Sequence, residues 1–142
     1  MLPADIRRYP KLAFYVRINL PQVMKVPAIV KAMNSIANLN QAQLRTALQW
    51  GIGPVIKITN LSGNYGEFSP GVKSNEIRIN TALVTDFENG LGRRMSKSGN
   101  VSLVGVTLLH ELVHWGDDQN GIDRPGEEGE EFERLVYGSV IN

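Results

Sequence analysis

The spacing of apolar residues predicts that the first third of the chain is mostly helical. Apolar residues recur every three or four positions in residues 25–39 and 41–50, which is the period of a helix with one buried face. Asn40 lies between the two segments, where its side chain can accept a hydrogen bond from the first turn of the second helix. We interpret these helices as a scaffold rather than a site.

After residue 50 the pattern changes to one typical of strands. A Gly-Ile-Gly-Pro segment at 51–54 ends the helical spacing, and the β-branched residues at 55–59 predict a strand. Residues 64–68 predict a short second strand, and the alternation of polar and apolar residues at 76–79 predicts a third. A short helix over 81–87 follows.

Two more helices are predicted in the last third. The Gly-, Ser- and Arg-rich residues 90–100 predict a loop, after which Asn100 or Ser102 can cap a helix running through Val101 to Trp115. This helix is apolar on nearly all sides, so we expect it to pass through the core. After a turn, residues 128–138 predict an amphipathic helix that buries Phe132.

The composition fits one globular domain. The chain has 142 residues, of which 42% are hydrophobic and 20% charged, and no apolar run approaches the length that spans a bilayer. We therefore expect residues 1–142 to form a single α+β domain with a small three-stranded sheet, N-terminal scaffold helices and two C-terminal helices. There are no cysteines, so a metal site must use His and carboxylate ligands. The N-terminus lacks the apolar stretch and cleavage site of a secretory signal.

Charge is unevenly distributed along the chain. Residues 1–110 carry 13 Lys and Arg against 5 Asp and Glu, whereas residues 111–142 carry 2 against 9. The acidic part could surround a cation with a negative field, or the two parts could simply face each other with complementary charge. Because the basic residues are scattered and the acidic part would repel phosphates, we expect no nucleic-acid partner.

Both histidines of the chain lie in His110-Glu111-Leu112-Val113-His114, an HExxH motif. On a helix the two imidazoles lie one turn apart on the same face, where both can bind one metal ion, and Glu111 is placed to act as general base. Burying these groups without a partner would be costly, which a bound cation would avoid. The expected ion is Zn²⁺, and the alternative is a pair of hydrogen-bonded core histidines.

A catalytic zinc usually takes a third protein ligand. Asp117 shares the helical stripe of His110 but lies about 10 Å further along the axis, so we expect it to hydrogen-bond a ligand imidazole instead of binding the ion. Five glutamates compete on the next helix: Glu127, Glu128, Glu130, Glu131 and Glu133. A helical wheel puts Glu130 opposite the apolar face and both Glu131 and Glu133 beside it, and does not choose between these two.

The motif followed by 18 residues and Glu133 resembles the HExxH-x18-E arrangement of gluzincin metallopeptidases, in which a glutamate of the following helix is the third zinc ligand. Residues 133–138 also resemble the third-ligand helix of the clostridial neurotoxin light chains. The whole segment 108–138 most resembles the metallopeptidase toxin 3 domains of bacterial polymorphic toxins. The resemblance favours Glu133 and implies a compact zincin-like fold. It is weak over residues 1–75.

Two positions depart from related patterns. Tyr137 stands where thermolysin-like gluzincins place an Asp, and Asn120 where metzincins place a third His. Asp123 lacks the Tyr-Gly that would follow it in aspzincins. The metzincin and aspzincin branches are therefore disfavoured.

The resemblance implies a zinc metallopeptidase acting as a secreted bacterial toxin or effector. A zinc-activated water would cleave a peptide bond with Glu111 as general base, and we select Tyr137 as oxyanion donor, with Tyr65, Arg93 and Arg94 as weaker candidates. The implied partners are a protein or peptide substrate and a cognate immunity protein. The domain would be the C-terminal part of a larger protein and act in the cytoplasm or periplasm of a target cell.

Two other function classes fit the same residues. One is a zinc amidase that acts on peptidoglycan or other envelope amides. The other is a binding module with a structural zinc, against which Glu111 argues because a structural site needs no base. By analogy with zincins, residues 75–80 would be the strand that binds the peptide, and an ordinary interior strand is the alternative.

Overall fold

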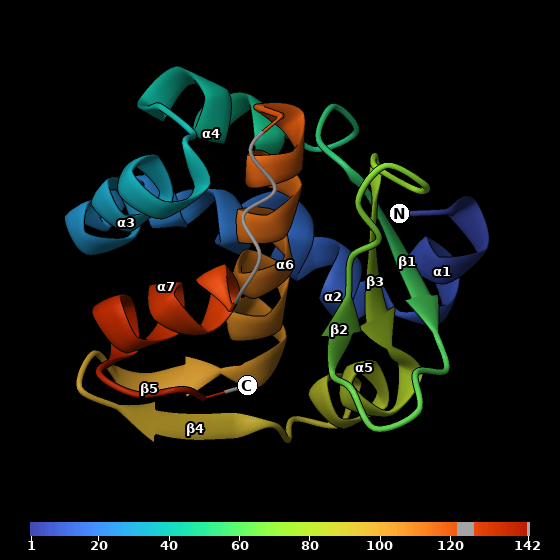
Figure 1. The fold of residues 1–142 in the computed structure, drawn as a ribbon. Helices are drawn as coiled ribbons and strands as arrows, with labels where there is room; N and C mark the ends of the chain where they lie inside the picture. The colour runs from blue at the N-terminus through green and yellow to red at the C-terminus, as the bar shows by residue number, and fades with distance from the viewer. Residues whose placement is uncertain (122–126, 142) are drawn as a thin grey trace.

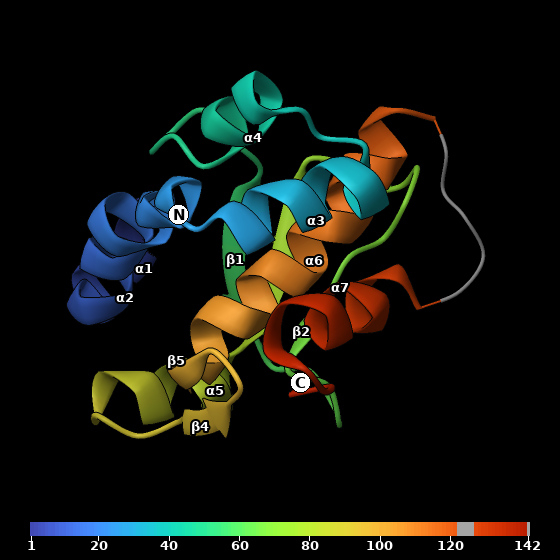
Figure 2. The same ribbon diagram turned by 90° about the vertical axis from the view of Figure 1, so that its left-hand side faces the viewer.

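Helix α6 (Leu103–Gln119) runs through the middle of the computed structural model, with helices on one side and a sheet on the other (Figure 1). Residues 1–121 and 127–141 are described. Helices α3 (Pro27–Ala37) and α7 (Glu128–Tyr137) pack against α6 and against each other, as Figure 2 shows from the side. The mixture of helices and strands agrees with the predicted α+β class.

The N-terminal part is helical, as the apolar spacing predicts. It begins with α1 (Pro3–Arg8), α2 (Pro10–Phe14), a π-helical turn (Tyr15–Asn19) and a 3₁₀ segment (Leu20–Lys25). Helices α3 and α4 (Gln41–Ala47) follow. The Asn40 side chain caps α4 by accepting from the Gln43 N–H at 2.8 Å, and the Gln43 side chain accepts from the Asn40 N–H at 2.9 Å. The predicted cap is confirmed, and it forms a reciprocal capping box.

The three predicted strands are present as β1 (Val55–Thr59), β2 (Gly66–Glu67) and β3 (Glu76–Asn80). β1 pairs in parallel with β3, and β2 pairs antiparallel with it, so the order is β1-β3-β2. β3 is therefore the central strand, and the prediction that it offers an edge to a peptide is wrong. Both of its edges are used by neighbours, and β2 is the edge strand beside α6.

Residues 90–100 do not form the predicted loop. After α5 (Thr81–Glu88), they contain β4 (Arg93–Ser96) and the start of β5 (Gly99–Ser102), which pair as an antiparallel hairpin. Gly99 has φ of 97°, and the Ser96 hydroxyl accepts from the Ser98 N–H and donates to the Gly99 carbonyl, which stabilises the turn. A solvent-exposed hairpin needs no alternation of apolar residues, so the pattern that reveals half-buried strands is missing here.

Helix α6 begins two residues later than expected, at Leu103, because Val101 belongs to β5. Ser102 occupies the N-cap position but makes no side-chain cap hydrogen bond. The predicted turn of residues 116–126 begins only after Gln119, and its residues 122–126, with Asp123, lie outside the described part.

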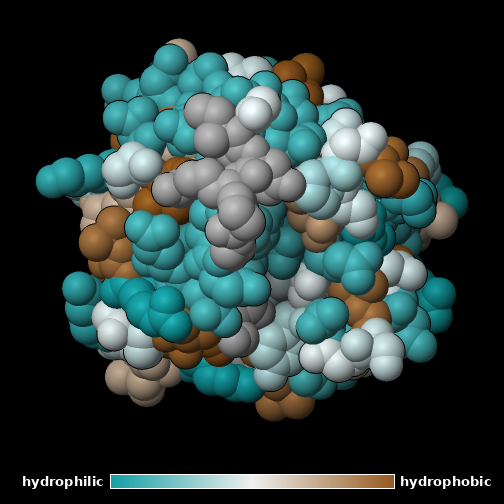
Figure 3. All heavy atoms as spheres, in the orientation of Figure 1, coloured by the Kyte–Doolittle hydropathy of each residue, from teal (hydrophilic) through white to brown (hydrophobic). Residues whose placement is uncertain are grey.

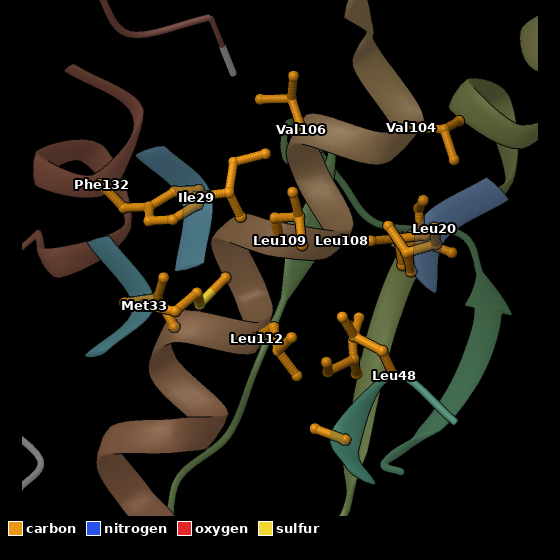
Figure 4. Packing of buried hydrophobic residues seen from close by; sticks show 14 of the residues in the cluster. Leu20, Ile29, Met33, Leu48, Val104, Val106, Leu108, Leu109, Leu112 and Phe132 are labelled. Carbon is orange, nitrogen blue, oxygen red and sulfur yellow. The ribbon is translucent and has the colours of Figure 1, made fainter. Parts of the chain in front are cut away.

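The core surrounds α6, which is buried on nearly all sides as predicted. Figure 4 shows Ile29, Met33 and Phe132 on one side of the helix and Leu20 and Leu48 on the other. The face seen in Figure 3 is mainly hydrophilic, with separate apolar patches. Among the described residues, no helix has the length and apolar character needed to cross a membrane.

Candidate active site

Helix α6 holds all three polar residues of the HExxH motif at its buried middle. His110 and Glu111 are buried, and the His114 side chain is 21% exposed. The two imidazole rings have centroids 5.3 Å apart. Two imidazoles that bind one tetrahedral ion through a ring nitrogen would have centroids about 5 Å apart, given zinc–nitrogen bonds of about 2 Å. The ring spacing therefore fits a shared ion.

Glu133 of α7 is the glutamate that reaches the first imidazole. Its side chain is fully buried, one carboxylate oxygen contacts His110 Nδ1, and the other accepts from the Ile141 N–H at 2.7 Å. Glu131 is exposed, and Glu130 pairs with Arg134 at 3.3 Å on the outer face. Of the glutamates that the helical wheel left open, only Glu133 faces the motif.

Glu128 is the residue that the sequence reasoning did not select. Its side chain is buried at the start of α7, and one carboxylate oxygen lies 3.4 Å from His114 Nδ1. The sequence did carry an indication, because Glu128 lies four residues before Phe132 and eight before Val136, on the same buried stripe. Helical spacing can indicate that Glu128 is buried, but only the packing of α7 against α6 shows that it contacts His114.

Gly129 allows α7 to approach the site closely. A Cβ atom at this position would come closer than 3.0 Å to three atoms of the His110 ring, including Nε2. The glycine backbone therefore lies directly against the imidazole, and a side chain here would displace either the ring or the helix.

On the other side of α6, Glu111 lies against the edge strand β2. A Cβ on Gly66 would be 3.0 Å from Glu111 Cγ and 2.7 Å from the Thr107 methyl, so this contact also depends on glycine. Burial, together with the negative charges of Glu67 and Glu127, raises the pKa of Glu111 to about 7, while His110 and Arg78 act in the opposite direction. The carboxyl is thus poised to exchange a proton near neutral pH.

The negative charges around His110 oppose the effect of burial on its pKa. Burial disfavours the imidazolium, but the Glu133 hydrogen bond and the charges of Glu111 and Glu127 raise the pKa of His110 above its ordinary value. A metal ion would compete with a proton for this imidazole.

Asp117 is fully buried near the end of α6, and its Oδ1 atom accepts a hydrogen bond from Asn38 Nδ2 at 3.4 Å. Asn38 follows α3 in a left-handed conformation with φ of 56°. This hydrogen bond joins the end of α6 to the α3–α4 connection. The predicted hydrogen bond from Asp117 to a ligand imidazole stays a prediction.

The oxyanion candidates lie in different places. Tyr137 is buried, its ring packs edge-on against Phe132, and it lines a cavity of about 250 Å³ with Tyr15 and Gly105. Tyr65 is 40% exposed and directly precedes Gly66, the residue against Glu111. The remaining two, Arg93 and Arg94, lie in the exposed hairpin strand β4.

The donor chemistry suits zinc, since imidazole and carboxylate are its usual ligands where cysteine is absent. Two further observations agree with a cation: the spacing of the imidazoles, and the buried Glu128 carboxylate, which lacks a hydrogen-bond partner in the described part of the chain. Yet within residues 1–121 and 127–141, no three His, Asp or Glu side chains already converge as a metal-binding group. The two glutamates instead contact one imidazole each, so ion binding would require these side chains to rotate.

Comparison with known proteins gives one match. The model of a family described as metallopeptidase toxin 3 matches residues 5–138, which is nearly the whole chain. No curated protein and no solved structure matches significantly. The matched residues include the N-terminal helices, although the sequence resemblance to this family is weak over residues 1–75.

Proposed function

The chain belongs to the metallopeptidase toxin 3 family, and from this we propose that it is a zinc-dependent metallopeptidase with its active site between α6, α7 and β2. The family supports a metal ion, peptide hydrolysis and a role as a toxin domain. The more specific proposal rests on the different neighbours of the HExxH side chains. Both imidazoles lie against glutamates of α7, while Glu111 lies against the edge strand β2.

His110, His114 and Glu133 would hold the ion. When bound, zinc would polarise the scissile carbonyl and lower the pKa of a water molecule toward neutrality. This ligand set is that of the gluzincin type, within a zincin-like fold. Glu133 is supported by its complete burial and its contact with His110.

Glu111 would act as the general base. It is buried on the face of α6 that meets β2, so a substrate lying along β2 would bring its scissile bond next to the carboxylate. Glu111 would take the proton of the attacking water and pass it to the leaving amine. This role requires a proton carrier at this position, which Gln cannot provide.

A peptide substrate would extend along the outer edge of β2. That edge is unpaired among the described strands, and its backbone can hydrogen-bond an extended chain of many sequences. Arg78 holds this strand, because its guanidinium donates to Glu67 Oε1 at 3.0 Å and to the Ser69 hydroxyl at 2.6 Å. An oxyanion donor must touch substrate, so the exposed Tyr65 is a better candidate than the buried Tyr137.

As a member of a toxin family, the domain would be delivered into a target cell and neutralised by a cognate immunity protein. We propose a protein or peptide substrate. Expression with and without periplasmic targeting determines whether the domain acts in the cytoplasm or the periplasm.

The test compares wild type with Glu111→Gln, expressed in bacterial cells with and without a periplasmic targeting sequence. We expect wild type to arrest growth and produce protein fragments in one compartment, and Glu111→Gln to do neither while keeping its fold and zinc. Equal toxicity of the two proteins would contradict hydrolysis and support a binding module. Toxicity restricted to the periplasm, with release of wall peptides instead of protein fragments, would replace the peptidase by an envelope amidase.

A further inference from the structure

The start of α7 carries a buried acid that neither the HExxH motif nor the third ligand explains. Glu128 is 4% exposed, and neither of its carboxylate oxygens has a hydrogen-bond partner among the residues that the structure describes. Burying a carboxylate is costly unless it has a polar or charged partner. An acid buried in such a place is expected to interact with a neighbouring polar group.

That neighbour is His114. One Glu128 oxygen lies 3.4 Å from His114 Nδ1, which is the nitrogen that remains when an imidazole binds a metal through Nε2. Imidazoles that bind metals usually donate their other ring N–H to a carboxylate, a carbonyl or water, which fixes the tautomer and the ring orientation. Glu128 lies at the position for that role.

The first imidazole has a matching arrangement. His110 also meets a glutamate of α7 through Nδ1, in this case Glu133. Each ring thus has its Nδ1 atom beside a carboxylate of α7.

Helix α7, which carries Glu128, is packed into the core. Phe132, one turn further along the same stripe, is completely buried, and the helix ends at Gly138 with φ of 86°. The acid also lies in the first turn of the helix, where the helix dipole favours a negative charge. Glu131 shares this first turn but is exposed, which makes it a matched control.

We propose that Glu128 is a positioning residue that accepts a hydrogen bond from His114 Nδ1 and thereby directs His114 Nε2 toward the ion. The inference rests on the proposed function, since it assumes that His110 and His114 bind zinc. It adds a second carboxylate of α7 to the site and assigns it to the imidazole instead of the metal.

The first experiment measures zinc affinity by competition with a chelator for wild type, Glu128→Gln, Glu131→Gln and His114→Ala. We expect Glu128→Gln to bind about one zinc per chain with affinity lowered about 10- to 100-fold. Glu131→Gln should match wild type, and His114→Ala should bind far more weakly than Glu128→Gln. The visible spectrum of the Co²⁺-loaded protein should shift in Glu128→Gln while keeping the intensity of a four-coordinate site.

Two results would overturn the inference: wild-type affinity and spectrum in Glu128→Gln, or a loss as complete as that of His114→Ala, which would make Glu128 a ligand. A wild-type protein that binds no zinc would instead refute the proposed function, so the two failures are distinguishable.

A second measurement needs no variant and so does not depend on the folding of Glu128→Gln. Long-range ¹H–¹⁵N correlation spectra of the zinc-loaded wild type report which nitrogen of each imidazole carries the proton. We expect His114 to be protonated at Nδ1 and metal-bound at Nε2. A proton on Nε2, with the metal at Nδ1, would contradict the role of Glu128.

Discussion

Gly129 sets how closely α7 can approach the face of α6 that carries His110. Its backbone lies against the His110 ring, while Glu128 and Glu133 of the same helix contact the two imidazoles. One helix therefore determines the orientation of both rings. The position of α7 is as important to the site as the motif itself.

This contact predicts the effect of Gly129→Ala. In an exposed helix position the change would stabilise the fold by about 1 kcal/mol, because alanine has the higher helix propensity. Here the added methyl overlaps the His110 ring, and we expect destabilisation of about 1–3 kcal/mol, as in other overpacked cores, together with weaker zinc binding. Urea unfolding and chelator competition measure the two effects, with Glu131→Ala as the control on the same helix. A stabilised Gly129→Ala protein with wild-type zinc affinity would show that the close approach has no role.

At the residue scale, the sequence predicted the motif well and its surroundings only in part. Helix geometry alone predicts that the two imidazoles of the HExxH motif lie on one face. The choice of Glu133 depends on the resemblance of its spacing to that of gluzincins. Glu128 and Gly129 were not selected, since their roles depend on where α7 crosses α6. That crossing is a tertiary feature, to which helical periodicity is insensitive.

At the element scale, β2 connects the sheet to the site. The strand has only two residues, so its backbone pairing alone is weak, and Arg78 holds it by side-chain hydrogen bonds. The same guanidinium also donates to Glu76 Oε2 at 2.9 Å. An Arg can serve these partners at once because its donors are spread across a planar fork.

We therefore expect Arg78→Met to loosen β2 and impair substrate binding. The loss of hydrogen bonds to charged groups should destabilise the fold by about 1.5–3 kcal/mol, and KM should rise more than kcat falls, because Glu111 and the imidazoles keep their positions on α6. Arg78→Lys retains the charge but not the planar fork of donors, so its stability and KM should lie between those of wild type and Arg78→Met. Steady-state kinetics and urea unfolding test this, and an unchanged KM in Arg78→Met would refute a role for β2 in binding.

The Arg78 cluster also predicts a pH dependence of stability. Burial alone would raise the pKa of Glu76, but hydrogen bonds from Arg78 and Lys57 outweigh it and lower the pKa below its ordinary value. A carboxylate with a lowered pKa in the folded state stabilises the protein above its unfolded-state pKa, and this contribution is lost as the pH falls through the lowered value. Glu76→Gln should therefore reduce stability at neutral pH and flatten the decline of stability in acid. Urea unfolding at a series of pH values tests this, and a decline parallel to that of wild type would contradict it.

The elements that the sequence missed share one physical property. Strands β1 and β3 carry buried apolar residues and were predicted, whereas β4 and β5 form an exposed hairpin without a buried apolar face. The prediction that residues 75–80 form the strand that binds the peptide was wrong for a related reason. Pairing order is a non-local property, and the pattern of a strand shows whether it is buried but not which neighbours it has.

At the scale of the whole molecule, the charge asymmetry of the sequence corresponds to a negative field at the site. Glu111, Glu133 and Glu127 all act on His110, and Glu67 joins them around Glu111. Among the described residues, the ion pairs do not join a Lys or Arg of residues 1–110 to an acid of residues 111–142. Because Arg78 also acts on Glu111, the field that attracts a cation stays a prediction beside the alternative of complementary charge.

A zinc site held by α6 and α7 also predicts that metal binding and global stability are coupled. Because the ion would bind the folded chain and not the unfolded one, saturating zinc should raise the unfolding midpoint, and a chelator should lower it. The same treatment should leave His110→Ala unchanged.

Metal analysis of the purified protein is the most direct measurement. The chain should contain about one zinc after exposure to the ion, and His110→Ala, with its fold verified by circular dichroism, should contain none. A wild-type protein that retains no more zinc than His110→Ala would contradict the metal site and the hydrolysis proposed to depend on it.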